Sequence, residues 1–257
     1  MLNKLEGKDL LDIVSRKHYQ AFHPRALELL KSLEGFKEIG IAHAHTYDKE
    51  RGEYILNNFD FANKKVVDIG ANVGFFSLQA ALAGAHSVYA YESNEEDARF
   101  IQLIVKGLYL EDRIIIKAES YDFKTLNAGT NDLLLCLNVL HHYGRYFGDL
   151  ESNLEESKSR IFEILNGLSL KNETCFYQMG YNWKGNEQLP LFGSGSKREM
   201  IESLKDAVMD YWEVINVAVI NPQTMRYQNY SEDLSGRFDF LGEFGNRPIF
   251  LLRSKRV

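Results

Sequence analysis

The chain has 257 residues, of which 45% are hydrophobic and 26% charged, and its formal net charge at pH 7 is −6. These proportions exclude a mostly disordered chain, and the length suits one large domain or a domain with an appended cap. The acidic balance disfavours a broad basic surface for nucleic acid or for an anionic membrane.

The first 60 residues differ in character from the rest and are predicted to form a helical cap that shapes the substrate site. Their clearest helix runs from Pro24 to Leu33, with apolar side chains at helical spacing and a proline suited to the first turn. His43 and His45 alternate as on a strand and would share one face. This H-x-H pair lacks a third ligand at a diagnostic spacing, so we expect no metal site there.

From about residue 61, short strands and helices alternate. The predicted strands are 64–70, 87–93, 113–119, 132–140 and 173–180, and the predicted helices between them are 75–85, 94–107 and 152–168. Each parallel return crossover needs a helix, so this alternation predicts an α/β fold with a doubly wound, mostly parallel sheet. A helix at 197–208 and strands at 211–220 and 247–254 follow. The stretch 221–246 is predicted to be a long connection or a hairpin arm.

The two cysteines and the hydropathy of the chain bear on its location. Cys136 and Cys175 both lie inside apolar, strand-like runs, so we expect buried free thiols rather than a disulfide or a zinc site. The N-terminus has no continuous apolar segment followed by a cleavage site, and no stretch approaches the roughly 18 apolar residues of a membrane span. We therefore expect a cytoplasmic protein without membrane contact.

The loop after the first predicted strand reads VVDIGANVGFF and places Asp68, Gly70, Asn72 and Gly74 across a strand-to-helix turn. Glycines there let a cofactor approach the backbone, and the following helix offers unpaired N–H groups. The dinucleotide fingerprint G-x-G-x-x-G fails twice, because its second and third glycines would fall on Asn72 and Phe75. A P-loop fails as well, because no Gly-Lys-Ser/Thr follows.

This loop resembles motif I, D/E-x-G-x-G-x-G, of the class I (Rossmann-like) S-adenosylmethionine-dependent methyltransferase superfamily. Asn72 stands in place of the middle glycine, and asparagine tolerates left-handed backbone better than most residues. The resemblance covers about residues 60–180 and implies S-adenosylmethionine as the cofactor. It assigns Glu92, after the second strand, to the ribose hydroxyls, and Glu119, after the third, to the adenine amino group. A solvated loop charge is the alternative interpretation of Glu119.

The same resemblance completes the expected architecture. Residues 61–257 would form the methyltransferase domain, with residues 1–60 as its cap. The strands at 211–220 and 247–254 would be the sixth strand and an antiparallel seventh of a seven-stranded sheet. An NAD-dependent enzyme is disfavoured, because the loop lacks the glycines that a pyrophosphate requires.

The segment LNVLHHYG, residues 137–144, follows the fourth predicted strand. By the resemblance, this strand end faces the methionine half of the cofactor, with Asn138 as a cofactor contact. His141 and His142 are the candidate catalytic residues, one packed at the cofactor and the other taking a proton from a hydroxyl acceptor. His142 is the preferred base because it lies farther into the loop. Adjacent residues on an extended chain point to opposite sides, so we expect no metal here.

The predicted function is methyl transfer to a hydroxyl of a small molecule or glycan. Tyr181, Asn182 and Trp183, after the fifth strand, combine ring faces with hydrogen-bonding groups that suit a sugar or an aromatic ring. Two alternatives stay open: a tRNA- or RNA-modifying methyltransferase, which makes nucleic acid the less favoured partner, and a catalytically silent member that keeps the fold as a binding module. The sequence does not predict the oligomeric state.

Overall fold

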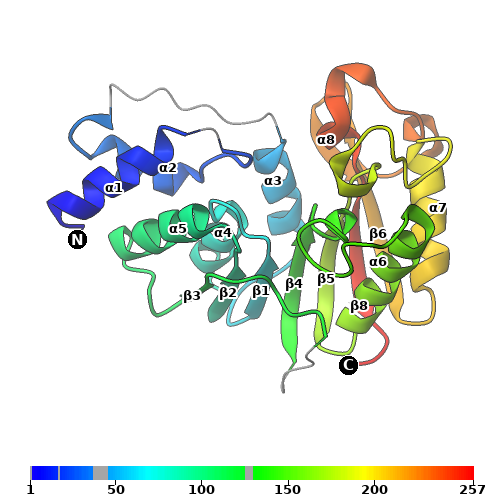
Figure 1. Cartoon of the computed structure of the whole chain (residues 1–257), viewed down its shortest axis with the longest axis horizontal. Helices are drawn as coiled ribbons and strands as arrows, with labels where there is room; N and C mark the ends of the chain where they lie inside the picture. The colour runs from blue at the N-terminus through cyan, green and yellow to red at the C-terminus, as the bar shows by residue number, and fades with distance from the viewer. Residues whose placement is uncertain (1, 17, 37–45, 125–129) are drawn as a thin grey trace. The chain divides into compact units, whose positions relative to one another are not determined.

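The computed structural model describes residues 2–16, 18–36, 46–124 and 130–257 (Figure 1). His43 and His45 therefore lie outside the described residues. The chain divides into two compact units, residues 1–121 and 122–257. The predicted boundary between a cap and a methyltransferase domain at residue 60 stays a prediction.

The first unit contains a parallel sheet in the order β3-β2-β1. Its strands are β1 (Lys65–Ile69), β2 (Ser87–Tyr91) and β3 (Ile114–Lys117). The helices between them are α4 (Phe75–Leu82) and α5 (Glu95–Gly107), so each parallel pair is joined by a helix, as its geometry requires. All five predicted elements are confirmed, with slightly shorter ends.

Three helices precede β1 in the same unit: α1 (Lys4–Val14), α2 (Pro24–Lys31) and α3 (Asp48–Asn58). A capping box begins α1, because the Asn3 side chain accepts from the Glu6 backbone N–H while the Glu6 carboxylate accepts from the Asn3 backbone N–H. α1 and α2 pack against α5, and α3 packs against α4. The N-terminal helices are therefore anchored on the helices that flank the predicted cofactor loop.

The second unit contains a mixed sheet in the order β4-β5-β8-β6-β7. Its strands are β4 (Asn131–Leu137), β5 (Asn172–Gln178), β6 (Trp212–Asn221), β7 (Arg226–Asn229) and β8 (Ile249–Ser254). β4 and β5 are parallel, with α6 (Leu154–Leu168) between them, and α7 (Lys197–Val208) precedes β6. β8 is antiparallel to β5 and β6, which confirms the predicted antiparallel last strand.

The stretch 221–246 has more structure than a simple connection. β7 forms an antiparallel hairpin with β6 and adds an eighth strand to the seven predicted. The short helix α8 (Gly242–Asn246) ends directly before β8 begins. The hairpin arm is thus confirmed, and the second half of the stretch leads the chain into the middle of the sheet.

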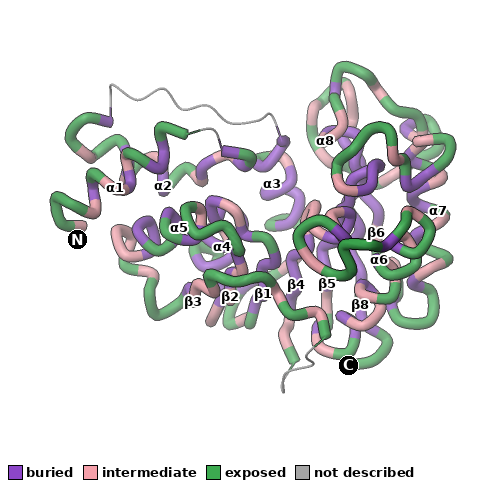
Figure 2. Tube along the Cα trace, in the orientation of Figure 1, coloured by how far each residue is buried: buried purple, intermediate pink, exposed green. Residues whose placement is uncertain are grey.

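Buried residues concentrate on the strands and on the inner faces of the helices (Figure 2). Cys136 and Cys175 are fully buried thiols, as expected, and burial raises the pKa of the Cys175 thiol. Among the described residues, no helix has the length and apolar character needed to cross a membrane.

Candidate functional site

The loop after β1 is shaped by three residues in left-handed backbone. The φ angles are +70° at Gly70, +50° at Asn72 and +76° at Gly74. Asn72 adopts the conformation that the middle glycine of the motif would adopt. At Gly74 space is limiting too, because an added Cβ would lie 3.1 Å from Ile101 Cγ1. The sequence pattern is therefore a requirement of the backbone at these positions.

Asp68 lies at the end of β1 and is buried. Its Oδ2 accepts a hydrogen bond from Ser77 Oγ of α4 at 2.6 Å. Burial raises the pKa of Asp68 to about 6, and the Glu92 charge adds to this increase, while the bond from Ser77 opposes it. The hydrogen bond between Asp68 and Ser77 thus connects β1 to α4 next to the loop. A contact between Asp68 and a cofactor stays a prediction.

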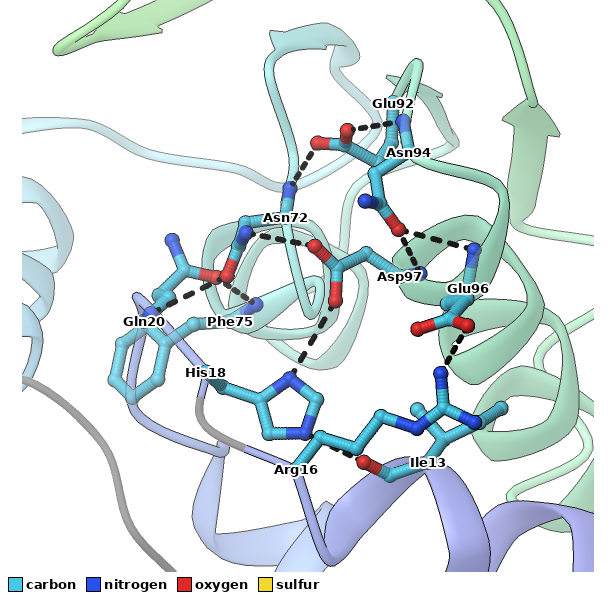
Figure 3. A network of polar contacts seen from close by, with 10 residues as sticks. All are labelled: Ile13, Arg16, His18, Gln20, Asn72, Phe75, Glu92, Asn94, Glu96 and Asp97. Atoms are coloured by element: carbon cyan, nitrogen blue, oxygen red, sulfur yellow. Dashed lines mark hydrogen bonds and ion pairs between the residues drawn. The ribbon is translucent and has the colours of Figure 1, made fainter.

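The Glu92 carboxylate holds the loop to the end of β2 (Figure 3). One oxygen accepts from the Asn72 backbone N–H at 2.8 Å and the other from the Asn94 backbone N–H at 2.7 Å. Glu92 is only 8% exposed, and burial raises its pKa. Each carboxylate oxygen can accept a second hydrogen bond. The group therefore fits the two hydroxyls of a ribose without giving up its contacts to the loop.

Glu119 is exposed and lies two residues beyond β3. Its charge is the second cause, after burial, of a raised pKa at Tyr91, which ends β2. Glu119 is thus close to the strand end that carries Glu92. Its contact with an adenine stays a prediction.

A segment of the N-terminal region contacts this loop directly (Figure 3). The Gln20 backbone N–H donates to Asn72 Oδ1 at 3.2 Å, and Gln20 Oε1 accepts from the backbone N–H of Phe75, the first residue of α4, at 3.1 Å. Asn72 Nδ2 donates to Asp97 Oδ2 at 3.0 Å, and His18 Nδ1 lies 3.4 Å from Asp97 Oδ1. Sequence reasoning missed Gln20, which belongs to no motif.

In the second unit, the chain leaves β4 through Asn138, whose φ is +64°. Its backbone N–H donates to the Gln178 carbonyl at 2.7 Å, and its Nδ2 donates to Gln178 Oε1 at 3.0 Å. Its Oδ1 accepts from an Arg247 N–H at 2.8 Å. Gln178 Nε2 donates in turn to the Arg247 carbonyl and to Tyr227 Oη. Asn138, which is predicted to contact the cofactor, is therefore also the centre of a polar network.

Arg247 is the charged group of this network and was missed by sequence reasoning. It is 2% exposed, and its guanidinium pairs with Glu243 at 2.7 Å and lies 4.1 Å from the centre of the Phe244 ring. Its Nε has no hydrogen-bond partner. Arg247 pairs with Glu243, four residues before it, and with Asn138, which is distant in sequence. No local sequence pattern predicts such contacts.

The two histidines do not lie on extended chain. β4 ends at Leu137, three residues before the predicted end, because the left-handed Asn138 turns the backbone into a 3-10 helix over Leu140–His142. The imidazole rings stack, with centroids 4.1 Å apart. The premise that the two side chains point to opposite sides is therefore wrong. Among the described residues, no group of three His, Cys, Asp or Glu could hold a metal ion.

The stacked histidines are both neutral near pH 7. His141 is buried and its Nδ1 accepts from the Gly180 backbone N–H at 3.2 Å, and burial keeps its pKa well below the usual value. His142 is half-buried, with its Nδ1 lacking a partner. Burial, followed by the charges of Arg145 and Arg247, lowers the pKa of His142 to about 4. His142 is therefore a weaker base than an exposed histidine, and its catalytic role stays a prediction.

The aromatic residues after β5 are mostly internal. Tyr181 is 1% exposed and donates its hydroxyl to the Asn246 carbonyl at 2.8 Å. The Trp183 indole N–H donates to the Tyr143 carbonyl at 2.7 Å. The exposed ring beside the histidines is Tyr146, whose centroid lies 5.1 Å from that of His142. Trp183 thus supports the turn after β4, while Tyr181 bonds to the last residue of α8.

Comparisons with known proteins agree with this architecture. No family model matches the chain. Probable histone-arginine methyltransferase 1.3 of Arabidopsis thaliana is 31% identical over 222 residues, which cover 80% of this chain and 40% of that protein. The histone-arginine methyltransferase CARMER of Anopheles gambiae is 46% identical over 65 residues, 25% of this chain and 10% of that protein. The chain spans at most about two fifths of the length of these relatives.

A solved structure shows the fold alone. The protein WbdD, determined with its C-terminal bundle ordered, superposes with a TM-score of 0.57 at 16% identity, over 97% of this chain and 42% of that chain. The superposition covers both units of this chain and confirms the predicted α/β class.

Proposed function

We propose that this chain, which belongs to the class I (Rossmann-like) superfamily of S-adenosylmethionine-dependent methyltransferases, binds S-adenosylmethionine and transfers a methyl group to a hydroxyl of a small molecule or glycan. The cofactor, when bound, supplies an electrophilic methyl group on a sulfonium. The observation that carries the proposal is the Glu92 carboxylate, which is nearly buried, holds the glycine-rich loop and retains acceptor capacity for a ribose.

The residues after β4 are assigned to the acceptor. In this proposal His142 accepts the hydroxyl proton, and His141, fixed by the Gly180 N–H, supports its ring. A pKa of about 4 keeps His142 neutral at working pH, so its imidazole is available to accept a proton. The same low pKa makes it a weak base, so the driving force for the proton transfer is small. Its contribution is therefore mainly to orient the hydroxyl and to receive the proton late in the transfer.

Protein arginine methylation is the second candidate, and the sequence similarity to histone-arginine methyltransferases favours it. A guanidinium acceptor is best held by carboxylates that accept paired hydrogen bonds. The segment Asn138–Gly148 contains no Asp or Glu, and Glu243 already pairs with Arg247. The charge of the turn after β4 therefore favours a hydroxyl over a guanidinium. RNA modification has no comparable support.

Transfer of a radiolabelled methyl group from S-adenosylmethionine tests the choice of acceptor. The full chain is incubated with a panel of hydroxylated small molecules and oligosaccharides and, separately, with an arginine-rich histone-tail peptide. We expect label in the hydroxyl panel and a loss of roughly 10²-fold or more in His142→Gln, since positioned proton acceptors contribute on that order. Label on peptide arginine alone would establish the second candidate, and an intact chain that binds no S-adenosylmethionine would indicate a silent binding module.

The same proposal places the protein in the cytoplasm. Cys136 and Cys175 are buried as free thiols, which suits a reducing compartment.

A further inference from the structure

We infer that the acceptor carries an anionic group, a phosphate or a carboxylate, which Arg145 and Lys184 bind beside His142. This inference rests on the proposed function and narrows its acceptor to a small molecule or glycan with a negative charge near the reacting hydroxyl. It follows from three observations in the second unit: the geometry of two turns, the absence of acidic partners and the surroundings of His142.

Arg145 and Lys184 lie on two turns that contact each other. Lys184 belongs to the short 3-10 helix Trp183–Gly185, which contacts the 3-10 helix that carries the histidines. An Arg145 guanidinium N–H donates to the Lys184 carbonyl at 2.9 Å. The two cations are thus held on neighbouring backbone.

Aromatic rings hold both cationic groups in place. The Arg145 guanidinium lies 4.9 Å from the centre of the Tyr146 ring, which in turn lies beside His142. The Lys184 Nζ lies 4.0 Å from the centre of the Trp183 ring. A cation over a ring face keeps most of its hydrogen-bond donors available. Each group therefore keeps donors for an oxyanion without breaking its ring contact.

Neither cation has an acidic partner within the described part of the chain. The segments Asn138–Gly148 and Met179–Asn186 contain no Asp or Glu at all. Two arginines elsewhere in the same unit do have such partners: Arg160 pairs with Glu163, and Arg253 pairs with Glu213. The two turns beside the histidines thus carry cations and no carboxylate of their own, in a chain whose net charge is −6.

The surroundings of His142 support an anionic ligand independently. The His142 side chain is only half-buried, so part of its ring is accessible beside the two turns. The charged groups that act on its ring are Arg145 and Arg247, with Glu243 as the opposing carboxylate, and its stacked neighbour His141 is neutral. The net local charge is positive. An acceptor with a hydroxyl for His142 and an oxyanion for the two cations matches all of these groups.

An NMR titration of the histidine side chains tests the inference without requiring methyl transfer. The full chain, labelled with isotopes in histidine, is titrated with inorganic phosphate, with glucuronate and with neutral glucose at constant ionic strength. The signal of His142 is assigned from the variant His142→Gln. We expect saturable binding of one or both anions, no binding of glucose, and a rise of about one unit in the pKa of His142, because a bound anion offsets the nearby cations. The anion with the lower dissociation constant identifies a phosphate or a carboxylate as the acceptor's group.

The variant Arg145→Gln/Lys184→Gln provides the direct comparison, and Arg160→Gln, which removes an arginine from an exposed ion pair, is its matched control. We expect the double variant to lose saturable binding, by at least 10-fold in affinity, while the control binds as the parent chain does. Equal binding in the double variant would mean an adventitious ion only and overturn the inference. Tight binding of an RNA oligonucleotide without saturable binding of either small anion would overturn it as well.

Calorimetry with S-adenosylmethionine on the same preparations separates this inference from the proposed function. Retained anion binding without cofactor binding would reject the methyltransferase proposal and leave the anion site standing. Cofactor binding without any anion binding would reject the anion site and leave the methyltransferase proposal standing.

Discussion

The loop after β1 and the turn after β4 have opposite chemical characters. Around the first, the carboxylates of Asp68, Glu92 and Asp97 each accept hydrogen bonds from neighbouring groups. Around the second, Arg145 and Lys184 have no acidic partner in the described residues, and both histidines are neutral. Surroundings rich in hydrogen-bond acceptors and negative charge suit the ribose hydroxyls and the positively charged sulfonium of S-adenosylmethionine. Surroundings rich in hydrogen-bond donors suit an electron-rich molecule, which is why we propose the turn after β4 for the molecule that receives the methyl group.

The two regions also differ in what fixes their shape. The loop after β1 is held by the Gly70 and Ala71 N–H groups, which both donate to the Tyr91 carbonyl at 2.9 Å, and by the Glu92 carboxylate, which accepts from the Asn72 N–H. The turn after β4 depends above all on a buried cation, Arg247, and on its bonds to Asn138 and Glu243. Substitution of Glu92 should therefore damage the first region, and substitution of Arg247 the second.

The largest effect is expected from Arg247→Met. It removes a buried cation and leaves the Glu243 carboxylate and the side-chain oxygen Oδ1 of Asn138 without their partner, which should lower the free energy of unfolding by about 3–5 kcal/mol. The control Arg253→Met breaks an exposed ion pair with Glu213 and should cost less than about 1 kcal/mol. Urea unfolding of both variants measures the difference. Equal midpoints would show that the Arg247 network does not stabilise the second region.

A smaller effect is expected from each of the two histidines when the pH falls from 7 to 5. The pKa values of His141 and His142 are lowered in the folded chain, so below about pH 6.5 the unfolded chain binds more protons and stability falls as pH decreases towards 4. Each histidine contributes a slope of up to about 1.4 kcal/mol per pH unit. Asp68 acts in the opposite sense, because its raised pKa lets the folded chain take up a proton near pH 6.

Comparison of the parent chain with His141→Asn removes the contribution of Asp68, which both share. The variant should lose less stability than the parent between pH 7 and pH 5 in urea unfolding. Parallel pH profiles would contradict a buried, neutral His141.

The smallest effect is expected from Gln20→Ala. The side-chain amide oxygen caps the N–H of Phe75 beside the cofactor loop, and its loss should cost about 1 kcal/mol, or roughly a fivefold loss in S-adenosylmethionine affinity. Gln102→Ala, on the exposed side of α5, is the matched control and should leave the affinity unchanged. If both variants bind like the parent, the N-terminal segment does not order the loop.

Local patterns predicted most of the fold and the first half of the site. The helix predicted at 197–208 is confirmed, and the turn from Asp68 to Gly74 was identified by its resemblance to motif I, whose Gly and Asn positions the structure explains by their left-handed backbone. The predictions failed where one residue redirects the chain. Asn138 ends β4 early and brings the two histidine rings together, which an apolar run cannot indicate.

Residues that act across long sequence separations were also missed. Arg247 binds Asn138 at a distance of 109 positions, and Gln20 binds Asn72 across 52. Neither belongs to a motif, and the pKa of His142 depends in part on Arg247, which only the folded chain brings near it. The acceptor side is therefore the part of the site that required a structure.

The central claim is that Glu92 binds the ribose of S-adenosylmethionine, and isothermal titration calorimetry tests it most directly. The parent chain should bind S-adenosylmethionine at one site, and Glu92→Ala should lose affinity by roughly 100-fold, since hydrogen bonds to a charged group contribute about 1.5–3 kcal/mol each. Glu111→Ala, an exposed carboxylate before β3, should bind like the parent, and circular dichroism should show all three chains folded. Unchanged affinity in Glu92→Ala, or no binding by the folded parent chain, would contradict the account.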